Sequence, residues 1–248
     1  MSDKNTLMAG VPMVVSGIRV RQPTLNEIFK GIGYDSYSAY MYVLGMTVEQ
    51  FVEANQLKEF FDKLSPADKE TIHIFDLLSG DTPWRVLFAK ALSFFILGEV
   101  SISDEQIVVI DSDRTVVLTA TIYEQVRDSI LLAACLKNEE ETAPKGFVND
   151  AAKRAYERLM ELKKTHKKTD KPVKANPSMA MWNVIGAVSA HSSSYNLISI
   201  WDLTVWQLYD QFYRISKQEY LSGYAAKWAV WGSEKFDFDS WYKIETKK

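Results

Sequence analysis

Apolar side chains recur at steps of three and four residues along most of the first half of the chain, the spacing of one helix face. Tyr37, Met41 and Leu44 form one such stripe. Ile72, Phe75 and Leu78 form the next, and the following one runs from Leu87 to Phe95. The helices predicted here cover residues 24–32, 34–44, 65–80, 82–98 and 121–137.

Two of these predicted starts, and a third site at Thr47 before Phe51, carry the spacing of a capping box. In this motif a Thr hydroxyl accepts the backbone N–H three residues on, and a Glu or Gln there reaches back to the Thr N–H. The pairs are Thr24 with Glu27, Thr47 with Gln50 and Thr121 with Glu124. Ser65-Pro66 places a cap and a first-turn proline before another helix.

Two segments instead favour β-structure. Residues 14–20 alternate loosely and predict a short strand. Residues 106–110 and 115–119 are β-branched runs joined by four polar residues, the pattern of a β-hairpin. The expected fold class is therefore mainly α: a multi-helix body with one small β-hairpin near 106–119, followed by a C-terminal aromatic helical subdomain.

The C-terminal third is predicted to be helical and rich in aromatic residues. A helix begins at Pro177–Ser178, residues 192–196 form a loop, and a long amphipathic run starts at Leu197. One face of that run contains Trp201, Val205, Leu208 or Tyr209, Phe212 and Ile215, and continues through Tyr220, Tyr224, Trp228 and Trp231. Phe236 to Tyr242 alternates aromatic and polar residues and is expected to lie across the helices.

Charge is distributed unevenly and suggests where the domains divide. Residues 153–174 have a net charge of +6, whereas the rest of the chain has −9. We predict a helical body over 1–149, a basic helix and tether over 150–176, and an aromatic subdomain over 177–248. The tether is either a solvated linker or a binding segment for an acidic partner or nucleic acid. Its lysines are Lys163, Lys164, Lys167, Lys168, Lys171 and Lys174.

Composition adds one unusual feature to this picture, an excess of aromatic residues. Of the 12 Phe, 12 Tyr and 7 Trp, 15 lie between Trp182 and Tyr242. Such a stripe is either core or a binding surface, because Trp and Tyr are enriched at interface hot spots. Lys and Arg do not alternate with these aromatics, which argues against stacking on nucleic acid. The predicted partner-binding residues are Trp201, Trp206, Tyr209, Phe212 and Tyr213.

No motif in the sequence specifies a reaction. Cys135 is the single cysteine and is expected on a buried helix face. Gly31 and Gly33 lack the third glycine of a dinucleotide loop, and no metal-binding His or Cys pattern occurs. We therefore expect a non-enzymatic protein without cofactor or metal. Neither an export signal nor an apolar run of membrane-spanning length is present, so we expect a location in a cytoplasm.

Two segments resemble tail-morphogenesis proteins of phages and prophages of Gram-positive bacteria. The first is Tyr-Asn-Leu-Ile-Ser-Ile-Trp-Asp-Leu-Thr-Val-Trp-Gln-Leu-Tyr-Asp-Gln-Phe, residues 195–212. The second is Pro-Thr-Leu-Asn-Glu-Ile-Phe-Lys-Gly-Ile-Gly-Tyr, residues 23–34. The resemblance implies a tail assembly chaperone, which would coat the apolar tape-measure protein in the host cytoplasm before the tail tube polymerises. It implies no catalytic residue.

The resulting hypothesis is a phage protein of tail assembly that binds a helical partner such as the tape-measure protein. Self-association stays open. One alternative is a structural virion subunit of the neck, tail or baseplate, which would remain in the purified particle. The other is a nucleic-acid-binding regulator that uses the basic tether, whose affinity would fall steeply with salt.

Overall fold

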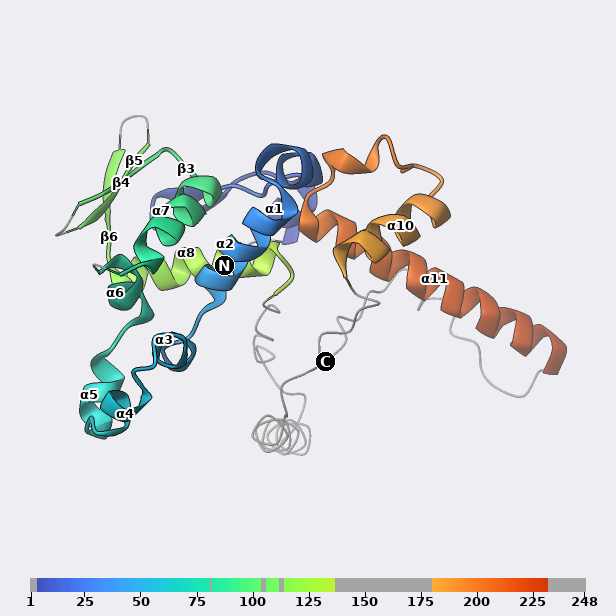
Figure 1. Cartoon of the computed structure of the whole chain (residues 1–248). Coiled ribbons are helices and arrows are strands. Elements are labelled where there is room, and N and C mark those ends of the chain that lie inside the picture. The colour runs from blue at the N-terminus through green and yellow to red at the C-terminus, as the bar shows by residue number, and fades with distance from the viewer. Residues whose placement is uncertain (1–3, 81, 104–105, 112–113, 137–179, 232–248) are drawn as a thin grey trace, which may run out of the picture.

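A computed structural model describes residues 4–80, 82–103, 106–111, 114–136 and 180–231 (Figure 1). The helices are α1 (Lys4–Ala9), η1 (Glu27–Ile32), α2 (Tyr34–Gly45), α3 (Val48–Ala54), α4 (Lys58–Asp62), α5 (Pro66–Thr71), α6 (Ile74–Ser79), α7 (Trp84–Phe95), α8 (Ala120–Ala133), α10 (Met181–His191), η3 (Ile200–Asp202) and α11 (Val205–Trp231). The strands are β1 (Met13–Val15), β2 (Ile18–Val20), β3 (Ile96–Leu97), β4 (Glu99–Ile102), β5 (Ile107–Asp111) and β6 (Arg114–Leu118). The expectation of a mainly α-helical chain is confirmed.

The predicted β-hairpin is also confirmed and belongs to a three-stranded antiparallel sheet. β5 pairs with β6 from Ile107 opposite Leu118 to Asp111 opposite Arg114. β4, which the sequence pattern did not predict, pairs with the other edge of β5. Alternate side chains of β5, those of Ile107 and Val109, are buried and join the common core.

Residues 14–20 form a hairpin of two short strands, not the single strand expected. β1 and β2 are joined by Ser16 and Gly17, both with left-handed φ angles of 50° and 85°. β2 also pairs with β3. This second sheet is tied to the first by Arg19, whose guanidinium forms an ion pair with Asp111 at 2.6 Å.

Two predicted helices are shorter than their apolar stripes. The helix expected over 65–80 is broken into α5 and α6, because Ile72 and His73 adopt extended backbone angles between them. The helix expected to reach Gly98 ends at Phe95, because Ile96 and Leu97 pair with β2 as a strand. In both cases apolar spacing continues through a change of backbone direction.

Local capping at the helix starts follows the sequence closely, with one shift. The Thr47–Gln50 box at α3 has both of its hydrogen bonds. At α8 the cap is Thr119, whose hydroxyl accepts the Ile122 N–H, so the expected Thr121 box is wrong. The turn that follows Thr24 is a π-helix, η1, and ends at Gly33, which has a φ of 83°.

The centre of the body packs three aromatic side chains from three helices. Tyr123 of α8 is fully buried, and its ring centroid lies 5.3 Å from those of both Phe75 and Phe88. Among the described residues, however, its hydroxyl has no hydrogen-bond partner. Burial raises the pKa of Tyr123, so this hydroxyl stays protonated.

This unpaired hydroxyl gives a first prediction. A buried polar group without a partner lowers stability, because it loses its hydrogen bonds to water on folding. The Tyr123→Phe variant keeps the ring contacts and is expected to raise the free energy of unfolding by about 1 kcal/mol in urea denaturation. A Tyr195→Phe variant, on a half-buried surface ring, should be nearly neutral. A loss of stability in Tyr123→Phe would contradict the assignment.

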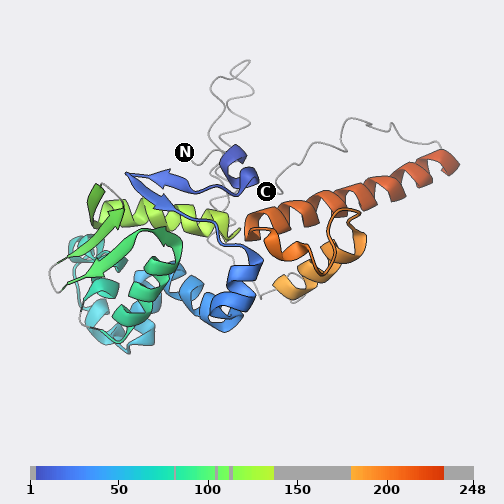
Figure 2. The same cartoon turned by 90° about the horizontal axis from the view of Figure 1, so that it is seen from above.

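The C-terminal elements pack against the body, with α11 as the longest helix described. Residues of α10 and the first turns of α11 belong to the same buried cluster as α2, α7 and α8. Trp201 was expected within the long helix. It lies instead in η3, because α11 starts only at Val205. The distal half of α11 projects away from the body (Figures 1 and 2).

Two further expectations concern Cys135 and the segments that follow it in the chain. Cys135 is exposed and has a left-handed φ of 57° just beyond α8, so the expected buried helix face is wrong there. The stretches 150–176 and 236–242 lie outside the described residues, and the domain boundaries stay a prediction. Within the described part of the chain, no helix is long and apolar enough to cross a membrane.

Candidate partner-binding face

The predicted face depends on how the start of α11 is fixed, and a capping box that was not predicted fixes it. The Thr204 hydroxyl accepts the Gln207 N–H at 3.3 Å, and the Gln207 side chain accepts the Thr204 N–H at 2.9 Å. Gln207 also donates to the Met8 carbonyl at 2.8 Å, which ties α11 to α1. The sequence contains the spacing Thr-x-x-Gln at this point. It did not indicate a helix start, because the amphipathic run was predicted to begin earlier, at Leu197.

This box faces the Thr24–Glu27 box of the body. Thr24 and Thr204 form an isolated antiparallel bridge, and the Leu25 N–H donates to the Leu203 carbonyl at 2.8 Å. The starts of η1 and α11 therefore lie against each other. In each, side chains of the capping box pair with first-turn N–H groups. The predicted Thr24–Glu27 capping box is confirmed, because Glu27 accepts the Thr24 N–H at 2.8 Å.

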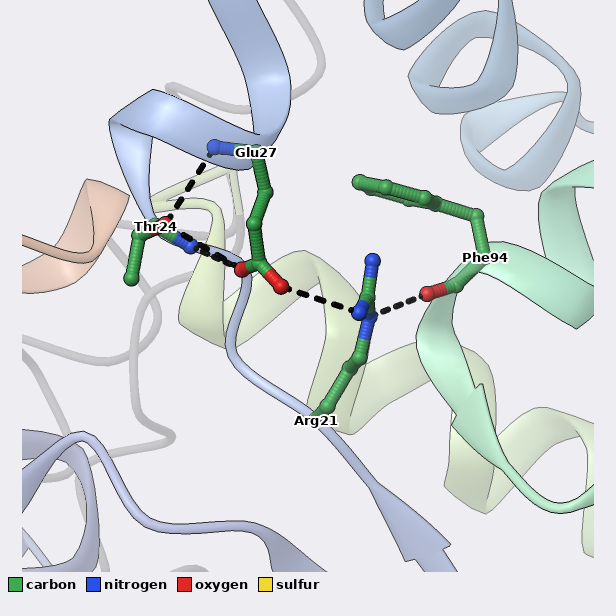
Figure 3. A network of polar contacts seen from close by, with 4 residues as sticks. All are labelled: Arg21, Thr24, Glu27 and Phe94. Carbon is green, nitrogen blue, oxygen red and sulfur yellow. Dashed lines mark hydrogen bonds and ion pairs between the residues drawn. The ribbon is translucent and has the colours of Figure 1, made fainter. Parts of the chain in front are cut away.

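Arg21 extends the Thr24–Glu27 box into a network that reaches α7 (Figure 3). Its Nη1 forms an ion pair with Glu27 at 3.1 Å, and its Nε donates to the Phe94 carbonyl at 2.5 Å. The guanidinium also lies over the Phe94 ring, 4.4 Å from the centroid. The turn on which α11 rests is thus held to the end of α7 by charge and by an aromatic contact.

An aromatic cluster lies beside this joint and combines both parts of the chain. The Trp201 ring meets Phe29 edge-on at 5.6 Å, and Phe29 stacks on Tyr34 at 5.2 Å. Lys30 Nζ lies 5.3 Å from the Trp201 ring centroid. The Trp201 indole N–H donates to the Leu197 carbonyl at 2.7 Å, which fixes the ring orientation. Phe29, Tyr34 and Trp201 are all half-buried, so part of each ring faces solvent.

The five predicted partner-binding residues divide into packed and exposed ones. Trp201, Trp206, Tyr209 and Phe212 are half-buried and lean against the core, whereas Tyr213 is 50% exposed. Burial raises the pKa of Tyr209 to about 12, with smaller contributions from Cys135 and two tyrosines, so its hydroxyl is neutral at physiological pH. The structure brings these residues to the base of α11.

The body supplies side chains to this face that sequence reasoning did not assign to it. Phe29 and Lys30 of η1 contact the Trp201 ring, and Tyr34 of α2 stacks on Phe29. They lie within residues 23–34, one of the two segments that resemble tail-morphogenesis proteins, and Trp201 lies within the other. This shared resemblance is the one signal in the sequence that could have linked them. We call the set Phe29, Lys30, Tyr34, Trp201 and Tyr213 the aromatic face. The six lysines of the tether, residues 163–174, lie outside the described residues.

Comparison with known proteins adds one result to this geometry. Residues 167–246 match the family model of the YomV second domain. That domain is of phage and prophage type, named after a protein of a Bacillus prophage. The matched region includes α10, η3 and α11, and so covers most of the aromatic part of the chain. No curated protein and no solved structure matches the chain.

Proposed function

We propose that this chain is a non-enzymatic phage protein of tail assembly that binds a helical partner, such as the tape-measure protein, through the aromatic face. The observation that carries the proposal is the half-exposed Trp201, whose ring meets Phe29 edge-on and lies 5.3 Å from Lys30 Nζ. Trp and Tyr at the edge of a rigid joint present a large contact area with little conformational entropy to lose. The phage-type domain match and the resemblance to tail-morphogenesis proteins support the setting.

The rigidity of the joint supports a binding role for this face. Both capping boxes, the Thr24–Thr204 bridge and the Arg21 network hold the face before any partner arrives. A preorganised face loses less entropy on binding than a mobile one, so more of the contact energy appears as affinity. A helix that presents apolar residues at i, i+3, i+4 and i+7 is the partner shape that such an aromatic edge accepts.

The test is affinity capture of the tagged full chain from cells that produce the phage, with the co-purified proteins identified by mass spectrometry. We expect the tape-measure protein or another tail protein to be enriched. Trp201→Ala and Tyr213→Ala should each lower its recovery about tenfold or more, as for an interface hot spot. Circular dichroism should show that both variants fold.

The matched control is Phe60→Ala. Phe60 is 68% exposed on α4, at the end of the molecule opposite α11 (Figure 1), so its removal should leave capture unchanged. Capture without any tail protein would overturn the proposal. Recovery of the chain in purified virions at the amount of a structural subunit would favour the alternative of a neck, tail or baseplate component.

A further inference from the structure

The part of α11 that follows Phe212 carries a seam of side chains that shares only Tyr213 with the aromatic face. Successive members are three and four residues apart in turn, which is the heptad spacing of paired helices. We call this set the distal seam: Tyr213, Ser216, Tyr220, Gly223, Lys227 and Val230. Tyr220 is 71% exposed and Val230 is 74% exposed, so large apolar side chains of the seam face solvent.

Gly223 is the unusual member of the seam. A glycine within an exposed helix lowers stability by about 1 kcal/mol relative to alanine. Within the described chain, a methyl group on Gly223 would meet no atom within 4 Å. No close contact inside the described chain therefore accounts for the glycine. It leaves a hollow on the helix surface, one turn from the exposed ring of Tyr220.

We propose that the distal seam pairs with the distal seam of a second copy of this chain, in antiparallel orientation. Tyr220 of each copy then lies over Gly223 of the other, and Tyr213 lies opposite Val230. Both contacts follow from a single alignment, because each pair is symmetric about the same point between residues 221 and 222. The large side chains fill the hollow that the glycine leaves, over a length of about 27 Å.

Charge selects the second copy and the antiparallel direction. Lys227 belongs to the seam and Glu219 flanks it. The alignment above places Glu219 of one copy within one turn of Lys227 of the other, twice over. A parallel pair would instead place Glu219 beside Glu219 and Lys227 beside Lys227, which are repulsive. The seam is thus complementary to itself only when the helices run in opposite directions.

The seam also continues a packing surface that already exists within the chain. Trp206 and Tyr209 precede Tyr213 at the same steps of three and four residues, and both pack against the core. Beyond the body, the same helix face has Tyr224 stacked on Tyr220, with ring centroids 6.4 Å apart, which orients the exposed Tyr220 ring. This inference does not depend on the tail partner, because its tests measure pairing of the purified chain and change residues outside the aromatic face.

The test is sedimentation velocity of the full chain over a wide range of protein concentration. We expect a monomer–dimer equilibrium. Gly223→Leu should weaken the dimer at least tenfold, because it fills the hollow, yet it should strengthen the helix itself in circular dichroism. The opposite directions of these two effects exclude a simple loss of folding. Ser222→Leu, one residue away on the outer side of the helix, is the matched control and should leave the dissociation constant unchanged.

A charge exchange tests the orientation. Glu219→Lys and Lys227→Glu should each weaken the dimer, and the double variant should restore it. In a parallel pair each residue would face its own copy, so each single variant would only replace one like-charge contact by another and would not weaken the dimer. A chain that stays monomeric at every concentration overturns the proposal. So does a dimer whose dissociation constant is the same in Gly223→Leu as in the unaltered chain.

Discussion

Replacing Gly98 with alanine is expected to lower the free energy of unfolding by about 3 kcal/mol or more. Gly98 has a φ of 124°, which side-chain-bearing residues rarely adopt. A Cβ there would lie 2.6 Å from the Ile110 carbonyl oxygen, a backbone atom that cannot move without disturbing β5. Strain and steric overlap therefore act together at the point where β3 passes into β4. Urea denaturation followed by circular dichroism measures the change.

Gly186→Ala serves as the control for this variant. Gly186 lies inside α10, and an added methyl would meet nothing within 4 Å in the described structure. The better helix propensity of alanine should raise stability by about 0.5–1 kcal/mol. If Gly98→Ala proves as harmless as Gly186→Ala, the close passage of β5 beside Gly98 is wrong.

The second large effect is expected at Arg127, where Arg127→Met should lower the free energy of unfolding by about 3 kcal/mol. The Arg127 Nε donates to the Leu44 carbonyl at 2.6 Å, and its Nη2 donates to the carbonyls of Gly45 and Met46 at 3.2 Å each. These carbonyls end α2 and have no helical partners of their own. Methionine keeps much of the buried volume but removes every donor, so the carbonyls lose their charged partner.

Arg214→Met is the matched comparison. Arg214 forms an ion pair with Asp210 at 2.7 Å on the surface of α11, where solvent screens the charges. Its loss should change stability by about 0.5 kcal/mol or less. Thermal denaturation of both variants distinguishes the two roles. Equal effects would mean that Arg127 does not cap α2.

The parts of the fold that sequence predicted are those that short-range chemistry decides. The capping boxes at Thr24 and Thr47 need only a hydroxyl and an acceptor three residues on, and both are formed. The hairpin near 106–119 needs only two β-branched runs and a polar turn. The length of α11 follows from an unbroken apolar spacing that continues to Trp231.

The parts that it missed depend on contacts between distant segments. Ile96 fits a helix by spacing, but pairing with Val20 makes it a strand. The helix expected over residues 65–80 breaks at Ile72 and His73, although the apolar spacing runs through both. The start of α11 moved because Thr204 pairs with Thr24 and cannot also be helical.

The sequence likewise predicted only part of the candidate site. The concentration of aromatics identified Trp201, Trp206, Tyr209, Phe212 and Tyr213, which the structure gathers near the base of α11. Their exposure could not be read from spacing, because the same stripe passes from the body into solvent along one helix. The contribution of Phe29 and Lys30 depends on tertiary packing against Trp201.

The hydrogen bond from Gln207 to the Met8 carbonyl has a consequence for synthesis on the ribosome. The two residues are 199 positions apart. At about 5–20 residues per second, the partner of this early carbonyl emerges only about 10–40 s later. During that interval Thr24 also lacks Thr204, so α1 and the segment around Thr24 stay without the partners that α11 and its start supply. Nascent chains should therefore acquire protease resistance in their opening segment only after α11 has left the exit tunnel.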